Sequence, residues 1–246
     1  MSYLSLQHRV SEAAAIDPGI LAWLYSMIAR APLVRTAYRH FLNGVLSQGV
    51  TEGWGLDLGT GPGFVAMEIA RRRPGLHMIG LDLAAHMVKR ATAEGGREVR
   101  RNQASRAGID RRGSWLQADG HRLPFADHSF QLVISSFALH HWGDPLRILD
   151  EIARVLAPGG RYYVADVCRE LNPIQRMLAY ASIPAISLPF GSYRGYGGYY
   201  ESVRAGYTRE EARALLKQCA LPSGEVGFDS TWFVPILTIA SKGTRP

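Results

Sequence analysis

The sequence predicts an α/β fold in which a doubly wound, mostly parallel seven-stranded sheet carries an N-terminal helical extension and a lid insertion after strand five. Short apolar runs alternate with helical-period segments up to residue 168, which is typical of parallel strands joined by helices. The first run leads into a glycine-dense turn, and the last two runs follow each other as a hairpin would. The strands expected are Trp54–Leu58, Leu76–Leu83, Ser114–Gln117, Phe130–Ser136, Arg161–Val167, Glu225–Ser230 and Trp232–Ser241.

The chain is expected to form a single domain over residues 1–246, because 246 residues with 47% hydrophobic content can bury one sizeable core. Within it we expect a helical N-terminal cover (1–50), a central core (51–168), a lid insertion (169–207) and a C-terminal helix with a hairpin (208–246). Helices are predicted at Ile20–Met27, Leu33–Leu46, Pro145–Leu156, Pro173–Ser182 and Thr208–Ala220, where Thr208 and Glu211 form a capping box.

The stretch Gly55–Ala70, GLDLGTGPGFVAMEIA, is expected to form a buried strand, a tight loop and a helix. Gly59, Gly61 and Gly63 permit positive φ angles and let a ligand approach the backbone closely. The N-terminus of the following helix favours an anionic group at this loop. The spacing differs from the dinucleotide-binding G-x-G-x-x-G because Phe64 replaces its third glycine. A turn that binds nothing is the alternative.

Two acids follow neighbouring strands at the edge where the glycine loop also lies. Asp82 ends the second strand, about 20 residues beyond the loop, where a carboxylate can accept hydrogen bonds from two ribose hydroxyls. The alternative for Asp82 is a helix N-cap. Asp119 comes just after the third strand, and the alternative there is an acid of a surface turn.

Three segments together resemble the class I S-adenosyl-L-methionine (SAM)-dependent methyltransferases. They are DLGTGPG, the ADGHRLPF string that follows the third strand, and FALHHWGDPLRILDEIARVLAPGGRYYVAD. The resemblance is to the small-molecule branch, which includes quinone C-methyltransferases and many natural-product enzymes, and it covers residues 53–168. It implies a Rossmann-like fold, SAM as cofactor and S-adenosyl-L-homocysteine (SAH) as product. This chain has Gln131 where the family usually has Asp, at the amino end of the fourth strand and away from the cofactor edge.

The resemblance also implies a set of cofactor contacts. The glycine loop would face the methionine part of SAM, Asp82 the ribose and Asp119 the adenine amino group, while Asp57 would brace the loop and reach the cofactor amino group. Leu83 and Met87 are placed to touch an adenine face, and the N–H of Gly120 to reach a ring nitrogen. The full candidate set is Asp57, Gly59, Thr60, Gly61, Gly63, Asp82, Leu83, Met87, Asp119, Gly120 and Ser135.

His140 and His141, just past the fourth strand, are the candidate general bases because imidazole titrates near neutral pH. A structural or substrate-contact role is the alternative. A base matters only if the acceptor must lose a proton, since alignment of the reacting atoms alone can supply about 7–11 kcal/mol. No metal is expected, since the two cysteines, Cys168 and Cys219, make no metal-binding pattern.

The segment Glu170–Tyr207 interrupts the alternation of strands and helices and is rich in glycine and aromatic residues. We expect it to form a mobile cover over the substrate site rather than a solvated linker, because its aromatic residues supply contact area. They are Phe190, Tyr193, Tyr196, Tyr199, Tyr200 and Tyr207.

The net charge of +7 and six arginines within residues 97–112 leave open an RNA- or membrane-associated methyltransferase, although a solvated helix face is the simpler interpretation. A third hypothesis is a SAM-binding protein without catalysis. The expected partner is a small-molecule acceptor methylated at O, N or C, and nucleic acid is not expected. With neither a long apolar run nor a leader-like N-terminus, the sequence favours a cytoplasmic protein.

Overall fold

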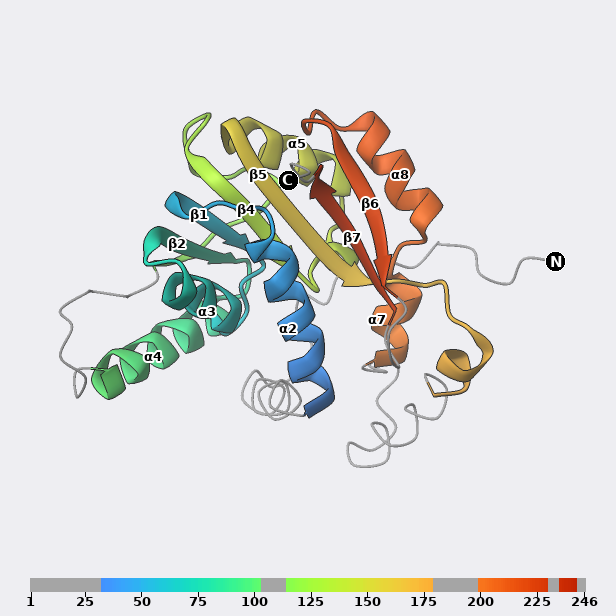
Figure 1. The fold of residues 1–246 in the computed structure, drawn as a ribbon, viewed down its shortest axis with the longest axis horizontal. Helices are drawn as coiled ribbons and strands as arrows, with labels where there is room; N and C mark the ends of the chain where they lie inside the picture. Colours follow the sequence, from blue (N-terminus) through green and yellow to red (C-terminus); the bar gives the residue numbers. More distant parts are fainter. Residues whose placement is uncertain (1–31, 103–113, 179–198, 230–234, 243–246) are drawn as a thin grey trace.

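The computed structural model describes residues 32–102, 114–178, 199–229 and 235–242 (Figure 1). Its sheet has seven strands in the order β3-β2-β1-β4-β5-β7-β6. The strands are β1 (Glu52–Leu58), β2 (Gly75–Asp82), β3 (Ser114–Gln117), β4 (Phe130–Ser136), β5 (Leu156–Val167), β6 (Gly224–Asp229) and β7 (Ile236–Ser241). Strands β1 to β5 are parallel, and β7 and β6 join as an antiparallel hairpin, so the predicted mostly parallel seven-stranded sheet of an α/β fold is confirmed.

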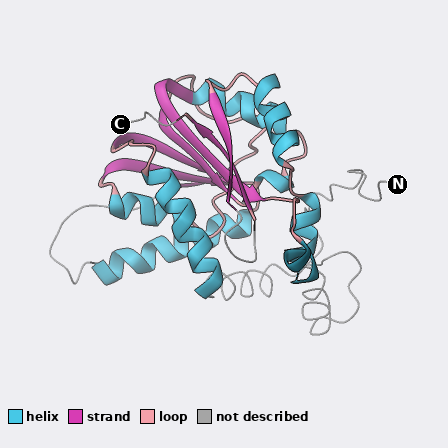
Figure 2. Ribbon diagram, turned by 45° about the vertical axis from the view of Figure 1, so that its right-hand side comes forward, coloured by secondary structure: helices cyan, strands magenta, loops and turns pink. Residues whose placement is uncertain are grey.

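Helices cover both faces of the sheet (Figure 2). They are α2 (Pro32–Leu46), α3 (Phe64–Arg72), α4 (Ala85–Asn102), α5 (Pro145–Val155), α7 (Tyr199–Ala205) and α8 (Arg209–Gln218), with a 3-10 turn η1 at Leu139–His141. Residues 173–178 are also helical. The expected helix at Ile20–Met27 and the rest of Pro173–Ser182 lie outside the described residues. Helix α8 begins with the predicted capping box of Thr208 and Glu211.

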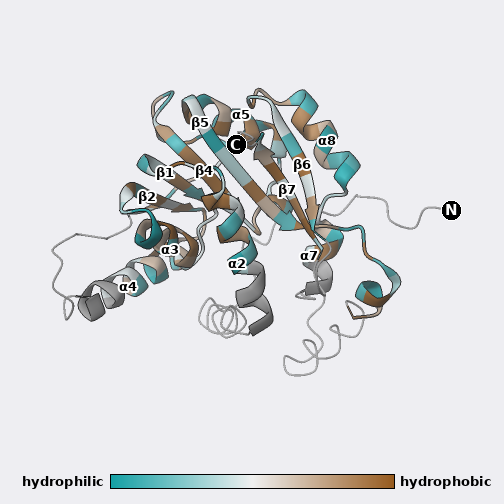
Figure 3. Cartoon of the chain, in the orientation of Figure 1, coloured by the Kyte–Doolittle hydropathy of each residue, from teal (hydrophilic) through white to brown (hydrophobic). Residues whose placement is uncertain are grey.

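Two apolar cores, one on each face, hold these layers together. On one face, Phe41 of α2 and Ile69 of α3 pack against Ile134. On the other, Leu149 of α5 joins Tyr162 of β5. Figure 3 shows hydrophobic residues along β4 and β7 and hydrophilic ones on α8. Burial on both faces explains why the central strands read as nearly continuous apolar runs.

The boundary between α5 and β5 differs from the prediction, which ended the helix at Leu156 and took residues 157–160 as a turn before the strand. Helix α5 ends at Val155, and Leu156 is already extended and paired with Phe130 of β4. Pairing then shifts before it resumes at Leu132 and Arg161. The ProGlyGly sequence is therefore an irregularity inside β5, which Gly159 permits with a φ of 76°.

Side chains on one face of α5 hydrogen-bond to the loop between β3 and β4. Arg154 donates to the carboxylate of Glu151, with 2.8 Å between Nη2 and Oε2. The same guanidinium donates to the carbonyl of Phe125 and the carboxylate of Asp127, both at 2.8 Å. Leu123 donates its N–H to Glu151 at 2.8 Å and accepts from Arg154 at 3.0 Å. The loop is thus fixed to the helix through its own backbone.

Replacing Arg154 by methionine is expected to lower the free energy of unfolding by about 2–4 kcal/mol, because the buried Glu151 carboxylate loses its cationic partner and keeps only the N–H of Leu123. Hydrogen bonding to Arg154 lowers the pKa of Glu151, so this stability is present at neutral pH and lost as the pH falls through the folded-state pKa. Urea denaturation at pH 7 and pH 4 measures both effects, and the variant should show the smaller difference between the two pH values.

The matched control is Arg71→Met on α3. Arg71 also pairs with an acid, Glu68, but its side chain is 50% exposed, so the expected loss is below about 1 kcal/mol. Equal losses of unfolding free energy in the two variants would show that the hydrogen bonds between α5 and this loop add no stability.

Candidate functional site

Because β1 to β4 are parallel, their carboxyl ends lie at one edge of the sheet, which we call the rim. The register pairs Leu58 with Leu81 and Asp82 with Gln117, so β1, β2 and β3 end side by side. The glycine loop, Asp82 and Asp119 therefore all follow strand ends at the rim, and Ser135 lies near the end of β4. A ligand crevice at the carboxyl ends of parallel strands is the rule for such sheets.

The glycine loop has the backbone that its sequence predicts. Gly59, Gly61 and Gly63 have φ angles of 74°, 53° and 82°. A Cβ on Gly59 would lie 2.6 Å from the Cβ of Ala138, and one on Gly63 would lie 2.5 Å from the Trp115 ring. A Cβ on Gly61 would meet nothing within 4 Å among the described residues. Two glycines are thus needed for packing, and Gly61 lies beside open space.

Asp82 ties the glycine loop to the start of α4. Its Oδ2 accepts the N–H of Gly61 at 2.8 Å, and its Oδ1 accepts the N–H of Ala84 at 2.9 Å. Burial raises the pKa of Asp82, while these two N–H groups lower it. The alternative role predicted for Asp82, capping of a helix N-terminus, is therefore partly present, because its carboxylate accepts the N–H of Ala84, which immediately precedes α4. Leu83 beside it is an exposed apolar side chain, 62% accessible, and Met87 on α4 is half-buried.

Asp57 is a completely buried carboxylate under the loop. Its Oδ2 accepts from the Thr60 hydroxyl at 2.7 Å, whereas its Oδ1 is buried without a hydrogen-bond partner among the described residues. Burial raises the pKa of Asp57 to about 7, the Thr60 hydroxyl opposes the rise, and the charge of Asp82 adds to it. Such a carboxylate would be stabilised by a cationic donor, which the amino group of an amino acid ligand provides.

Asp119 and Gly120 follow β3. The Asp119 side chain is 56% exposed. Hydrogen bonding to the N–H of His121 lowers its pKa, so it is ionised at neutral pH. A Cβ on Gly120 would lie 3.3 Å from Leu58 and 3.5 Å from Ile148, which places its backbone close to the end of β1 and to α5.

Ser135 is buried, and its hydroxyl donates to the carbonyl of Leu58 at 2.8 Å. This bond joins the ends of β4 and β1. In this conformation Ser135 is a structural link at the rim, and a cofactor contact of this residue stays a prediction.

A buried histidine that follows β4 and a buried aspartate near the end of β5 form a pair. His140 lies in η1, and its Nδ1 is 2.7 Å from Oδ1 of Asp166, near the end of β5. Asp166 also accepts the backbone N–H groups of His140 and Val167, each at 2.6 Å. Because Nδ1 faces an oxygen that accepts, the neutral ring of His140 carries its proton on Nδ1 and its lone pair on Nε2.

His141 lies against His140, with 3.8 Å between the ring centroids. Burial of the imidazole among protein atoms lowers the pKa of His141 to about 4 although the residue as a whole is exposed, and the adjacent His140 contributes. His141 is therefore neutral at neutral pH. The sequence reasoning named both histidines but missed Asp166, although an acid near the end of the fifth strand, at the same rim, was a usable signal.

The predicted cover is only partly described. Helix α7 lies within it and contacts η1, so part of this segment is close to the two histidines. Tyr207, which was expected in the cover, is instead buried in the apolar core, where its backbone bridges Cys168. Phe190, Tyr193 and Tyr196 lie outside the described residues, as do the side chains of the arginine-rich segment 97–112.

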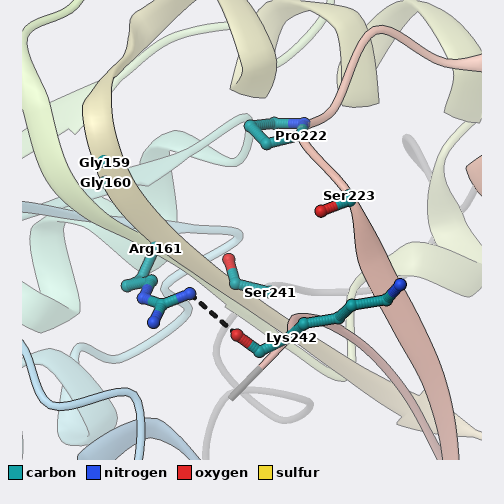
Figure 4. Close-up of a pocket in the computed structure, with 7 residues that line it drawn as sticks. All are labelled: Gly159, Gly160, Arg161, Pro222, Ser223, Ser241 and Lys242. Atoms are coloured by element: carbon teal, nitrogen blue, oxygen red, sulfur yellow. Dashed lines mark hydrogen bonds between the residues drawn. The ribbon is translucent and has the colours of Figure 1, made fainter. Parts of the chain in front are cut away.

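A cavity of about 360 Å³ lies at the opposite edge, between the start of β5 and the end of β7 (Figure 4). Its two cations do not converge, because Arg161 donates to the carbonyl of Lys242 while the Lys242 side chain points away (Figure 4). This cavity does not include the rim residues. Among the described helices, none is both long and apolar enough to cross a membrane.

Comparisons with known proteins show which sequences and structures this chain is similar to. The methyltransferase domain family matches residues 56–164. Over 166 residues the chain is 36% identical to a demethylmenaquinone methyltransferase of Thermus thermophilus, covering 65% of this chain and 70% of that protein. It is 32% identical over 125 residues to a ubiquinone/menaquinone biosynthesis C-methyltransferase of Desulfotalea psychrophila, covering 51% and 44%. A SAM-dependent methyltransferase structure from Aquifex aeolicus superposes with a TM-score of 0.57 at 17% identity, covering 92% and 98%.

Proposed function

We propose that this chain, which belongs to the class I SAM-dependent methyltransferases, methylates a ring carbon of a small hydroquinone. The class of enzyme and the cofactor follow from the family, and the acceptor is the step beyond it. The relatives named for demethylmenaquinone and for ubiquinone/menaquinone biosynthesis support a quinone-type acceptor. The observation that carries the proposal is the buried His140–Asp166 pair beside the rim, because a base is what carbon methylation of a phenolic ring requires.

The residues of the rim fit SAM, which supplies an electrophilic methyl group on a sulfonium. Asp57 has a buried oxygen without a partner for the amino group, and Gly61 borders open space at the loop. Asp82 would take the ribose hydroxyls, and Asp119 the adenine amino group. The exposed Leu83 would cover an adenine face, with Met87, Thr60, Gly59, Gly63, Gly120 and Ser135 completing the site.

His140 is the proposed base. Its Nε2 lone pair would accept the phenolic proton of the hydroquinone, which raises electron density on the ring carbon that attacks the methyl group. The same carbon must then lose its hydrogen as a proton so that the ring regains aromaticity; the ring oxygen regains a proton from protonated His140, and the proton from carbon leaves to solvent. Asp166 acts as a positioning residue, because it fixes the tautomer and stabilises the protonated ring. His141, neutral at pH 7, would contact the acceptor.

The acceptor would bind on the side of α2 and α7. Tyr38 of α2 meets Phe137 edge to face, with 5.8 Å between centroids, and Phe137 follows β4 three residues before His140. Phe137 has a φ of 54°, a conformation that bulky residues adopt at a cost. Helix α7, which contacts η1, would help to exclude water from this aromatic edge.

Two measurements test the proposal in order. Thermal-shift titration should show stabilisation by SAM and SAH and none by NAD. Transfer of labelled methyl from SAM to a demethylated naphthohydroquinone should then give a carbon-methylated product. Stabilisation by NAD alone would overturn the cofactor assignment. Binding of SAH with methylation of only oxygen or nitrogen acceptors, or of RNA, would overturn the hydroquinone assignment.

Cofactor binding is expected to release protons near pH 7. Because the pKa of Asp57 is raised to about 7 in the folded protein, it is partly protonated there, and a cationic amino group beside it favours the ionised form. Affinity for SAH should therefore rise about tenfold from pH 6 to pH 8. Calorimetry in buffers of different ionisation enthalpy measures the protons released. The variant Asp57→Asn should lose this release, and an unchanged release would assign it to another group.

A further inference from the structure

Asp119 offers one of its two carboxylate oxygens to a ligand. Its Oδ1 accepts the backbone N–H of His121 at 2.9 Å and faces Nδ1 of the same residue at 2.6 Å. Among the described residues no donor contacts Oδ2. The side chain is more than half exposed, so Oδ2 is accessible at the rim.

The hydrogen bonds of His121 define its tautomer. The backbone N–H of Asp144 donates to Nε2 of His121 at 3.2 Å, so Nε2 carries a lone pair. The proton of the neutral ring is then on Nδ1, where it points at Oδ1 of Asp119. Both ring nitrogens are thereby used, and the ring bridges the acid to the N-cap residue of α5.

Helix α5 is a rigid support for this bridge. Arg147 donates from Nε to the carbonyl of His121 at 3.1 Å, and its own backbone N–H is capped by Asp144. The opposite face of the helix is buried in the apolar core through Ile148 and Leu149. The position of His121 therefore follows that of a packed helix rather than that of an exposed loop.

We propose that His121 is a positioning residue that locks Oδ1 of Asp119 and so aims Oδ2 at the exocyclic amino group of the cofactor's adenine. The inference rests on the proposed placement of SAM at the rim. The inference adds that the preference for adenine over other bases depends on His121, whose own contacts are with Asp119 and α5. A carboxylate with one oxygen fixed discriminates better than one that rotates, since a rotating group loses entropy when it binds.

The test compares binding of SAH with that of S-inosylhomocysteine, in which a carbonyl replaces the adenine amino group. Wild-type protein should bind SAH at least about 10-fold more tightly, because Oδ2 accepts from the amino group and is repelled by the carbonyl. In His121→Gln the side-chain amide reaches towards Asp144 and leaves Oδ1 without its side-chain donor. This variant should lose at least about 5-fold of the preference.

The control variant is His121→Asn, whose amide nitrogen takes the place of Nδ1 and should restore most of the preference. His121→Ala provides a second removal of the donor if the glutamine variant unfolds. Equal weakening of both ligands, or an unchanged preference in His121→Gln and His121→Ala, would overturn the inference and leave the proposed function standing. A wild-type protein that binds neither ligand would overturn the proposed function itself.

Discussion

Replacing Asp82 by alanine is expected to weaken SAH binding by about 100- to 1,000-fold. The substitution removes the carboxylate proposed to accept both ribose hydroxyls. It also removes the acceptor that holds the N–H of Gly61, so the glycine loop loses one of its anchors at the rim. Calorimetric titration of SAH measures the affinity, and the melting temperature without ligand reports whether the variant is folded.

Two further variants separate the charge from the shape of Asp82. Asp82→Asn keeps one acceptor oxygen and should weaken binding by a smaller factor, about 10- to 50-fold. Glu225→Ala removes an exposed acid on β6, away from the rim strands, and should leave the affinity unchanged. Unaltered SAH affinity in a folded Asp82→Ala protein would show that the ribose lies elsewhere.

The sequence predicted the elements whose causes are local. The strands Ser114–Gln117 and Phe130–Ser136 have the predicted bounds. For Phe130–Ser136 the cause is an apolar run between polar turns, which is typical of a buried strand. The capping box of Thr208 and Glu211 is equally local, since its two hydrogen bonds join residues three positions apart. The early start of β5 was missed because ProGlyGly is typical of a turn, whereas pairing of Leu156 with β4 makes it an irregularity in a strand.

The missed functional residues depend on contacts between distant segments. Asp166 meets His140 because β4 and β5 pair in a register that places Ala165 opposite Ser136. His121 contacts the N-cap of α5, 23 residues further along the chain. The position of Asp166 near the end of the fifth strand places it at the rim, but the spacing of residues does not show which side chain it or His121 contacts, so both contacts had to be read from the packed structure.

Asp166→Asn is expected to lower kcat by about 100- to 1,000-fold, the range that general acid–base catalysis supplies, while the affinity for SAH stays within about twofold. With its amide oxygen in the place of Oδ2, an asparagine still accepts the N–H of His140, but it loses the hydrogen bond from Val167, whose N–H bonds to Oδ1. Its NH2 group, in the place of Oδ1, then faces Nδ1 of His140 and donates to it, which moves the ring proton to Nε2. The base would lose its lone pair at the cost of one backbone hydrogen bond.

Removing the base itself provides the comparison. His140→Ala should lower kcat to the same degree, and the double variant should be no slower than either single variant, because the two residues act as one unit. His141→Ala should instead raise the KM for the acceptor and leave kcat within about threefold, since its ring is proposed to contact the acceptor and not to hold the proton. If the fold-losses of kcat caused by Asp166→Asn and His140→Ala multiply in the double variant, the two effects arise separately. The pair would then have a structural role and would not act as an oriented base.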